Sequence, residues 1–124
     1  NRAGNACEYC RISAELRPSG CHVDHIISLK HGGETVTENL AYACLSCSVN
    51  KGTDLGSISR RTGELVRFYN PRRDSWEEHF RLEGARIESL TDIGEVTERI
   101  FHFNDEERVL ERQLLIEVNR YPSP

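Results

Sequence analysis

The sequence has no long apolar run, no methionine and no excess of basic residues. No segment approaches the roughly 18–20 consecutive apolar residues of a membrane-spanning helix, which predicts no membrane partner. No apolar stretch follows the first five residues, so no secretory signal peptide is visible and we expect a cytoplasmic location. The absence of methionine, the initiator included, predicts a chain excised from a longer product.

The charge is acidic overall and unevenly divided. The chain has 124 residues with 16 basic and 20 acidic side chains, a net charge of −4 that excludes a uniformly basic nucleic-acid binder. Residues 1–63 carry 7 basic against 6 acidic side chains, and residues 64–124 carry 9 against 14. A polyanionic partner therefore has to meet a local basic surface, which we expect on the first half. The length corresponds to one compact domain with a small appended lobe and excludes two separate cores.

Four of the five cysteines form two C-x-x-C pairs. Cys7 and Cys10 make the first pair, Cys44 and Cys47 make the second, and residues 11–43 separate them. Two such pairs supply four thiolates in an arrangement suited to tetrahedral Zn²⁺. The odd cysteine count disfavours two disulfides, and a redox protein needs only one such pair. We therefore predict a structural zinc, with Cys21 as a small apolar core residue.

The segment between the cysteine pairs predicts two strands and a short helix. Residues 23–27 contain three β-branched apolar side chains and favour a strand, which Gly32-Gly33 ends in a polar loop. Residues 39–43 favour a second strand, and residues 47–51 form one or two helical turns stopped by Gly52. The order is strand, loop, strand and helix, with zinc tying the start to the end.

This ordered set of residues resembles the HNH endonucleases of ββα-metal fold. The residues that carry the resemblance are, in chain order, Asp24-His25-Ile26, Gly32-Gly33, Asn39-Leu40, Cys44-x-x-Cys47 and Lys51-Gly52. Together with the first cysteine pair they span residues 7 to about 54, and the stretch 71–80 looks like the tail of bacterial stand-alone members. The resemblance implies an α+β protein. It also implies that residues 1–63 form a nuclease unit stapled by zinc and that residues 64–124 form a C-terminal strand and helix extension packed on it.

The resemblance also implies a metal-dependent endonuclease that hydrolyses DNA phosphodiester bonds, by nicking or by cleavage. Such hydrolysis needs a water nucleophile, a base and a cation. His25 is the implied general base, because imidazole titrates near neutral pH. Asp24 is a hard oxygen ligand suited to a catalytic Mg²⁺ or Mn²⁺. Asn39 matches the middle residue of the motif, whose amide is expected to brace the loop and orient the histidine.

The second ligand of the catalytic ion departs from the family pattern. The family has His or Asn directly after the last cysteine, where this chain has Ser48. Serine hydroxyls bind Mg²⁺ in phosphate-loop enzymes, so Ser48 is one candidate. Asn50 is the other, although about 100° of rotation per residue puts it nearly opposite Ser48 on a helix. A site weakened by the serine is the third outcome. Lys51 shares the face of Ser48 and is predicted to contact a DNA phosphate.

Strand alternation adds a rival ligand. Adjacent residues of a regular strand point to opposite faces, so Asp24 and His25 share one site only where the strand ends or is distorted. His22 does share a face with Asp24. His22 is therefore a secondary candidate for binding the catalytic ion.

The sequence from residue 60 onward contains a group of arginines and apolar residues that repeat at helical spacing. Five arginines form a candidate DNA surface: Arg60, Arg61, Arg67, Arg72 and Arg73. We predict DNA contacts for Arg72 and Arg73, although each arginine taken alone is typical of a solvated surface. Leu110, Leu114 and Val118 follow helical spacing and are predicted to be core.

Two other function classes stay open beside the endonuclease. Ser48 and the negative net charge support a catalytically weakened, zinc-stabilised module that binds nucleic acid or another partner. A thiol redox protein is the third class. The oligomeric state is also open, because the helical stripes can pack within one chain or between two.

Overall fold

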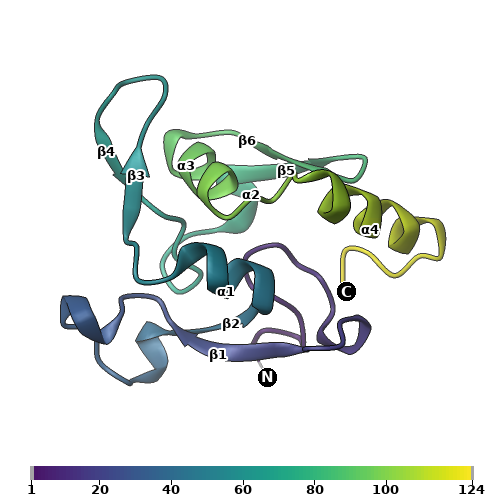
Figure 1. Cartoon of the computed structure of the whole chain (residues 1–124), viewed down its shortest axis with the longest axis horizontal. Coiled ribbons are helices and arrows are strands. Elements are labelled where there is room, and N and C mark those ends of the chain that lie inside the picture. Colours follow the sequence, from purple (N-terminus) through teal and green to yellow (C-terminus); the bar gives the residue numbers. More distant parts are fainter. Residues whose placement is uncertain (1, 124) are drawn as a thin grey trace.

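The computed structural model describes residues 2–123. Its first part contains an antiparallel hairpin of β1 (Cys21–His25) and β2 (Leu40–Cys44), followed directly by α1 (Leu45–Lys51). Figure 1 shows α1 lying over this hairpin. Three short 3₁₀ turns lie in the connections: η1 (Ala14–Leu16), η2 (Leu29–His31) and η3 (Thr37–Asn39). The predicted order of strand, loop, strand and helix is confirmed, and with it the α+β class.

Two alanines let α1 approach the hairpin closely. In the β1–β2 register Asp24 pairs with Ala41 and His22 pairs with Ala43, so these four side chains lie on one face. Ala41 and Ala43 are buried, and α1 contacts both strands. Because the alanines are small, the longer Asp24 side chain on the same face can reach the helix.

The second part of the chain, from β3 onward, contains two further hairpins and three helices. The antiparallel pairs are β3 (Gly56–Ile58) with β4 (Leu65–Arg67), and β5 (Phe80–Glu83) with β6 (Arg86–Ser89). The helices are α2 (Trp76–His79), α3 (Asp92–Ile100) and α4 (Glu106–Glu117). α3 packs against β3, β4 and β6 (Figure 1). Within residues 2–123, none of the helices has the length and apolar character that crossing a membrane requires.

One buried cluster joins the two parts. Tyr9, from the N-terminal loop, packs on Phe101 just after α3, with ring centroids 5.0 Å apart. Trp76 donates its indole N–H to the Tyr9 carbonyl oxygen at 2.8 Å and packs on Phe80. The boundary expected between residues 63 and 64 lies in the turn between the paired strands β3 and β4. Strand pairing thus crosses the expected boundary, and residues from both sides contribute to one hydrophobic core. The division into two units stays a prediction.

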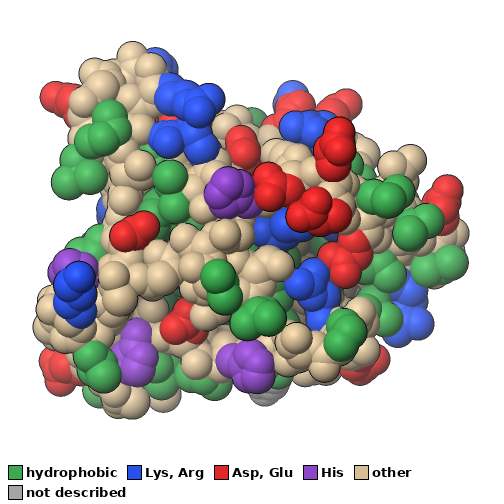
Figure 2. Space-filling model, in the orientation of Figure 1, with side chains coloured by type: hydrophobic (Ala, Val, Ile, Leu, Met, Phe, Trp, Pro, Cys, Tyr) green, Lys and Arg blue, Asp and Glu red, His purple; other side chains and the backbone are tan. Residues whose placement is uncertain are grey.

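The apolar stripe of α4 faces solvent, so the prediction that it is core is wrong. Leu110, Leu114 and Val118 are 55%, 55% and 61% exposed, and Figure 2 shows hydrophobic side chains at the surface over α4. The buried face of the helix carries Arg108 and Arg112 instead. Their guanidinium groups donate to backbone carbonyl oxygens beneath the helix. Leucine has no donor with which to satisfy these buried acceptors.

Candidate functional site

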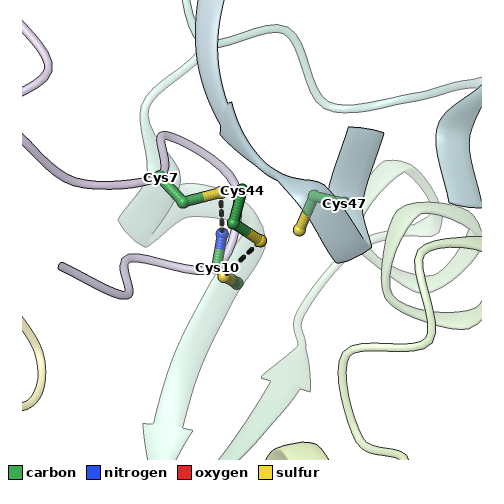
Figure 3. A group of neighbouring side chains, drawn as sticks. All are labelled: Cys7, Cys10, Cys44 and Cys47. Carbon is green, nitrogen blue, oxygen red and sulfur yellow. Dashed lines mark hydrogen bonds between the residues drawn. The ribbon is translucent and has the colours of Figure 1, made fainter. Parts of the chain in front are cut away.

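Four cysteine sulfurs converge where the N-terminal loop meets the hairpin and α1 (Figure 3). Cys7 and Cys10 lie in that loop, Cys44 ends β2, and Cys47 lies in the first turn of α1. Their sulfur atoms all lie within 4.8 Å of one another, and all four residues are buried. Cys21 lies outside this group. It is buried, as predicted for a core residue, and burial raises the pKa of its thiol to about 12.

The sulfur geometry fits a tetrahedral metal ion. Zn–S bonds of about 2.3 Å at tetrahedral angles place sulfurs roughly 3.8 Å apart, and Cys10 Sγ and Cys44 Sγ lie 3.7 Å apart. Burial raises the pKa of the Cys7 and Cys47 thiols well above the ordinary value, so an incoming metal has to displace their protons. These four residues can hold a metal ion such as Zn²⁺.

Asp24 and Ser48 meet between β1 and α1. Ser48 Oγ donates to Asp24 Oδ2 at 3.1 Å, and the His25 backbone nitrogen donates to Asp24 Oδ1 at 3.0 Å. A carboxylate beside a hydroxyl offers the oxygen ligands that hard divalent cations prefer. Of the two candidates for the second ligand, the structure places Ser48 beside Asp24.

Asn50 points away from this carboxylate. Its Nδ2 donates to the Phe101 carbonyl oxygen at 3.0 Å, so its amide is bonded to the second part of the chain. Ser48 and Asn50 therefore lie on different faces of α1, as helical rotation requires. His22 lies on the Asp24 face of the hairpin but is exposed, and its side chain has no hydrogen-bond partner within residues 2–123. It stays a secondary candidate.

The His25 imidazole is held by the loop between β1 and β2. His25 Nε2 lies 2.9 Å from Thr35 Oγ1. The alternation expected from the strand is present, because the Asp24 side chain reaches α1 whereas the His25 side chain reaches the loop. No pattern in the sequence marks Thr35, which lies among polar loop residues and acquires its position only when the loop folds back on β1.

Asn39 braces the same loop through three hydrogen bonds. Its Oδ1 accepts from the Ile27 backbone nitrogen at 2.9 Å, and its Nδ2 donates to the carbonyl oxygens of Ile27 at 2.9 Å and Glu34 at 2.8 Å. This close packing explains why residue 33 is a glycine, because a Cβ on Gly33 would lie 1.7 Å from the Ile27 carbonyl oxygen. The amide thus joins the chain just after the histidine to the far side of the loop.

The three predicted DNA contacts differ in whether they are available. Lys51 is 3% exposed and its Nζ donates to the His25 carbonyl oxygen at 3.1 Å. Burial lowers its pKa, and the nearby Asp24 carboxylate opposes that shift. The Arg72 side chain is withdrawn into an ion pair with Glu8. Arg73 is exposed, and its side chain has no partner in the described part of the chain. The structure therefore leaves Arg73 as the available cation and makes Lys51 and Arg72 structural residues.

Acids neutralise much of the expected basic track. Arg61 binds both carboxylate oxygens of Asp92, at 2.9 and 2.6 Å, and Arg67 binds both oxygens of Asp74, at 2.7 and 2.9 Å. Figure 2 shows acidic and basic side chains lying next to one another on the upper part of the visible face. A continuous basic stripe is therefore absent from these arginines.

A cavity of about 210 Å³ adjoins the histidine end of β1. Its lining includes Ile26 and Ile27, which directly follow His25, together with Lys51, Phe68 and Arg73. The lining thus combines apolar side chains with the available Arg73 cation.

A hairpin followed by a helix and clamped by four cysteines is a small α+β metal-binding unit. The family model for the HNH endonuclease matches residues 7–54. This match includes the hairpin, α1, the four cysteines and the Asp24–His25 pair, so residues 7–54 belong to the HNH endonuclease family, as the resemblance predicted. Searches of curated proteins and of solved structures give no significant match to the chain.

Proposed function

We propose that this chain is a metal-dependent endonuclease that hydrolyses phosphodiester bonds in DNA. The observation that carries the proposal is the meeting of Asp24 and Ser48 at the junction of β1 and α1, with His25 directly after Asp24 in β1, inside the segment that matches the HNH family. A carboxylate and a hydroxyl that can hold a divalent ion, followed in the strand by an imidazole that can act as a base, are the groups that metal-assisted hydrolysis requires.

The residues divide the chemistry between them. Asp24 and Ser48 would hold a divalent ion such as Mg²⁺ or Mn²⁺, which would supply positive charge against the charge that develops on the phosphate. His25 Nε2 lies 2.9 Å from Thr35 Oγ1. In the tautomer with its proton on Nε2, this nitrogen donates to the threonine hydroxyl, and Nδ1, unpartnered within residues 2–123, can take the proton of the attacking water. Lys51 ties the His25 backbone to α1, so the base and the carboxylate keep a fixed relation.

The substrate strand enters beside the cavity next to His25. Arg73 contacts a phosphate, because it is the exposed cation in that wall that has no ion-pair partner within residues 2–123, whereas Arg67 is paired with Asp74. A single phosphate contact carries no sequence information, so Arg73→Gln is expected to weaken binding of all DNA sequences alike and to lower the salt dependence of binding.

The decisive experiment is nicking of supercoiled plasmid DNA with Mg²⁺ or Mn²⁺. His25→Ala is expected to lower the rate at least about 100-fold, the usual contribution of a general base. The matched control is His102→Asn, because His102 is an exposed histidine of the second part and Asn tolerates its positive φ of 56°. Equal rates for wild type and His25→Ala would overturn the enzyme proposal.

The four cysteines hold a structural zinc in this proposal, with a stoichiometry of one zinc per chain. Metal analysis of the purified protein tests it directly. A zinc content near one per chain also argues against a thiol redox protein, because zinc-bound thiolates are not free to form disulfides.

One observation favours the second candidate, a zinc-stabilised binding module with a weakened site. The Ser48 hydroxyl donates a hydrogen bond to Asp24, and serine is a shorter ligand than the His or Asn of the family pattern. A protein that binds zinc and DNA but nicks no plasmid with either cation would be this module.

A further inference from the structure

A buried arginine lies against the four-cysteine site. Arg108, in the first turn of α4, is 6% exposed. Its Nη2 donates to Cys47 Sγ at 3.3 Å, and its Nη1 donates to the carbonyl oxygens of Phe101 at 2.7 Å and His102 at 3.2 Å. The guanidinium is therefore fixed by backbone on one side and directed at a cysteine sulfur on the other.

The negative charge of the four-cysteine site explains why a buried cation beside it is stabilising. Four thiolates around Zn²⁺ carry a net charge of −2, and all four cysteines are buried. A buried charge is costly unless it is paired and hydrogen-bonded. Arginine stays charged in proteins and donates through a planar fork, so Arg108 reduces the net charge of the buried cluster to −1.

We propose that Arg108 is a positioning residue of the zinc site, supplied by the C-terminal part to stabilise the thiolate of Cys47. The inference rests on the proposed structural zinc. Arg108 lies 61 residues beyond Cys47 in the chain and outside the segment that matches the HNH family. The C-terminal part thus completes the metal site of the nuclease segment, rather than only covering its core.

The same helix provides a matched control. Arg112 lies one turn further along α4, is 2% exposed, and donates to the carbonyl oxygens of Ala85 and Phe103 and to Asn104 Oδ1. No hydrogen bond joins Arg112 to a cysteine within residues 2–123. Arg112→Met therefore removes a buried arginine and its carbonyl contacts but leaves the hydrogen bonding of the sulfurs unchanged.

The test compares zinc retention in Arg108→Met and Arg112→Met, with the full chain loaded with zinc. Transfer of zinc to a chromophoric chelator measures affinity, and circular dichroism reports the folded fraction. Residues that support metal ligands typically contribute 10–100-fold to metal affinity. We expect Arg108→Met to lose at least about tenfold in affinity, and Arg112→Met to stay within about twofold per folded molecule.

A spectroscopic readout separates the sulfur contact from a general structural role. In protein loaded with Co²⁺ instead of zinc, loss of the N–H···S bond should shift the thiolate-to-metal charge-transfer band in Arg108→Met, with rescue towards the wild-type band by Arg108→Lys. If Arg108→Met does not fold, Arg108→Gln is compared with Arg112→Gln, because the amide keeps a donor for the carbonyl oxygens but removes the cation beside the sulfur. A band shifted only in Arg108→Gln supports the role of Arg108, and equal bands in the two variants overturn it.

The outcomes are distinguishable. A wild-type protein that binds no zinc overturns the structural zinc itself. A wild-type protein that binds zinc, with equal losses in Arg108→Met and Arg112→Met and an unshifted cobalt band, overturns the role of Arg108 alone.

Discussion

Replacing Asn39 tests whether the loop between β1 and β2 depends on one amide. Asn39→Ala removes three side-chain hydrogen bonds, one from the Ile27 nitrogen and two to the carbonyl oxygens of Ile27 and Glu34. Each such bond contributes about 0.5–1.5 kcal/mol net. Since the loop is partly exposed and water replaces some of the lost partners, we expect a cost of about 2–3 kcal/mol in the free energy of unfolding.

Asn39→Asp separates the donors of the amide from its shape. The introduced carboxylate can still accept from the Ile27 nitrogen, but it faces two carbonyl oxygens where the amide had donated. Facing acceptors raise the pKa of the introduced carboxyl above its unfolded value near 3.9. The loss in free energy of unfolding relative to wild type is therefore largest at neutral pH. It becomes smaller as the pH falls through the raised folded-state pKa, because the protonated carboxyl can donate a hydrogen bond.

Urea unfolding of the zinc-loaded protein at pH 7 and pH 5, with hydrogen exchange at the Ile27 amide, measures both effects. The matched control is Thr37→Ala in the same loop, because the Thr37 hydroxyl donates only to the exposed Glu38. We expect the control to change the free energy of unfolding by less than about 0.5 kcal/mol. Equal urea midpoints for Asn39→Ala and Thr37→Ala, with unchanged exchange at Ile27, would refute the reasoning.

Three further predictions concern the metal sites and one ion pair. Ser48→Asn is expected to raise the nicking rate severalfold, because the longer amide offers an oxygen ligand beside Asp24; an unchanged rate would mean that Ser48 is not at the metal. Removal of zinc with a strong chelator is expected to abolish the cooperative unfolding transition, which circular dichroism follows, and added zinc to restore it. The ion pair with Arg67, aided by a backbone N–H, holds the pKa of Asp74 below its ordinary value. Its stabilisation is therefore present above the unfolded pKa near 3.9 and is lost as the pH falls through the folded value. Because the Arg67 side chain is 45% exposed, Asp74→Asn should cost only about 1 kcal/mol at pH 7, and the difference should vanish in acid melts.

The nuclease segment could be predicted because its signals are local and mutually consistent. The cysteine pairs, the β-branched run at residues 23–27 and the glycine pair each fix a short element. The structure has the hairpin and helix that these signals predict, with boundaries shifted by one or two residues. The rotation along α1 also separates Ser48 from Asn50 as expected, because a helix fixes the direction of each side chain once its position is known.

The orientation of α4 resisted prediction because the periodicity of its apolar residues is misleading. Leu110, Leu114 and Val118 repeat at the spacing of a buried stripe, yet they face solvent. Arg108 and Arg112 repeat at the same spacing on the buried face, where their donors meet carbonyl oxygens of other segments. Hydrophobic periodicity cannot weigh backbone acceptors that only the tertiary fold brings beneath the helix, and burying them without donors would be costly.

Ion pairs between distant residues decide which cations a polyanion can meet, and no local pattern encodes them. Arg61 and Asp92 are 31 residues apart, and Arg72 and Glu8 are 64 apart. In each ion pair the positive and the negative charge cancel one another locally. The net charge of each half therefore does not measure the electrostatic potential at the candidate site. In the proposed function, the availability of Arg73 would therefore matter more for DNA binding than the net charge of −4, and a divalent ion held by Asp24 and Ser48 would supply most of the attraction of the first half for phosphate.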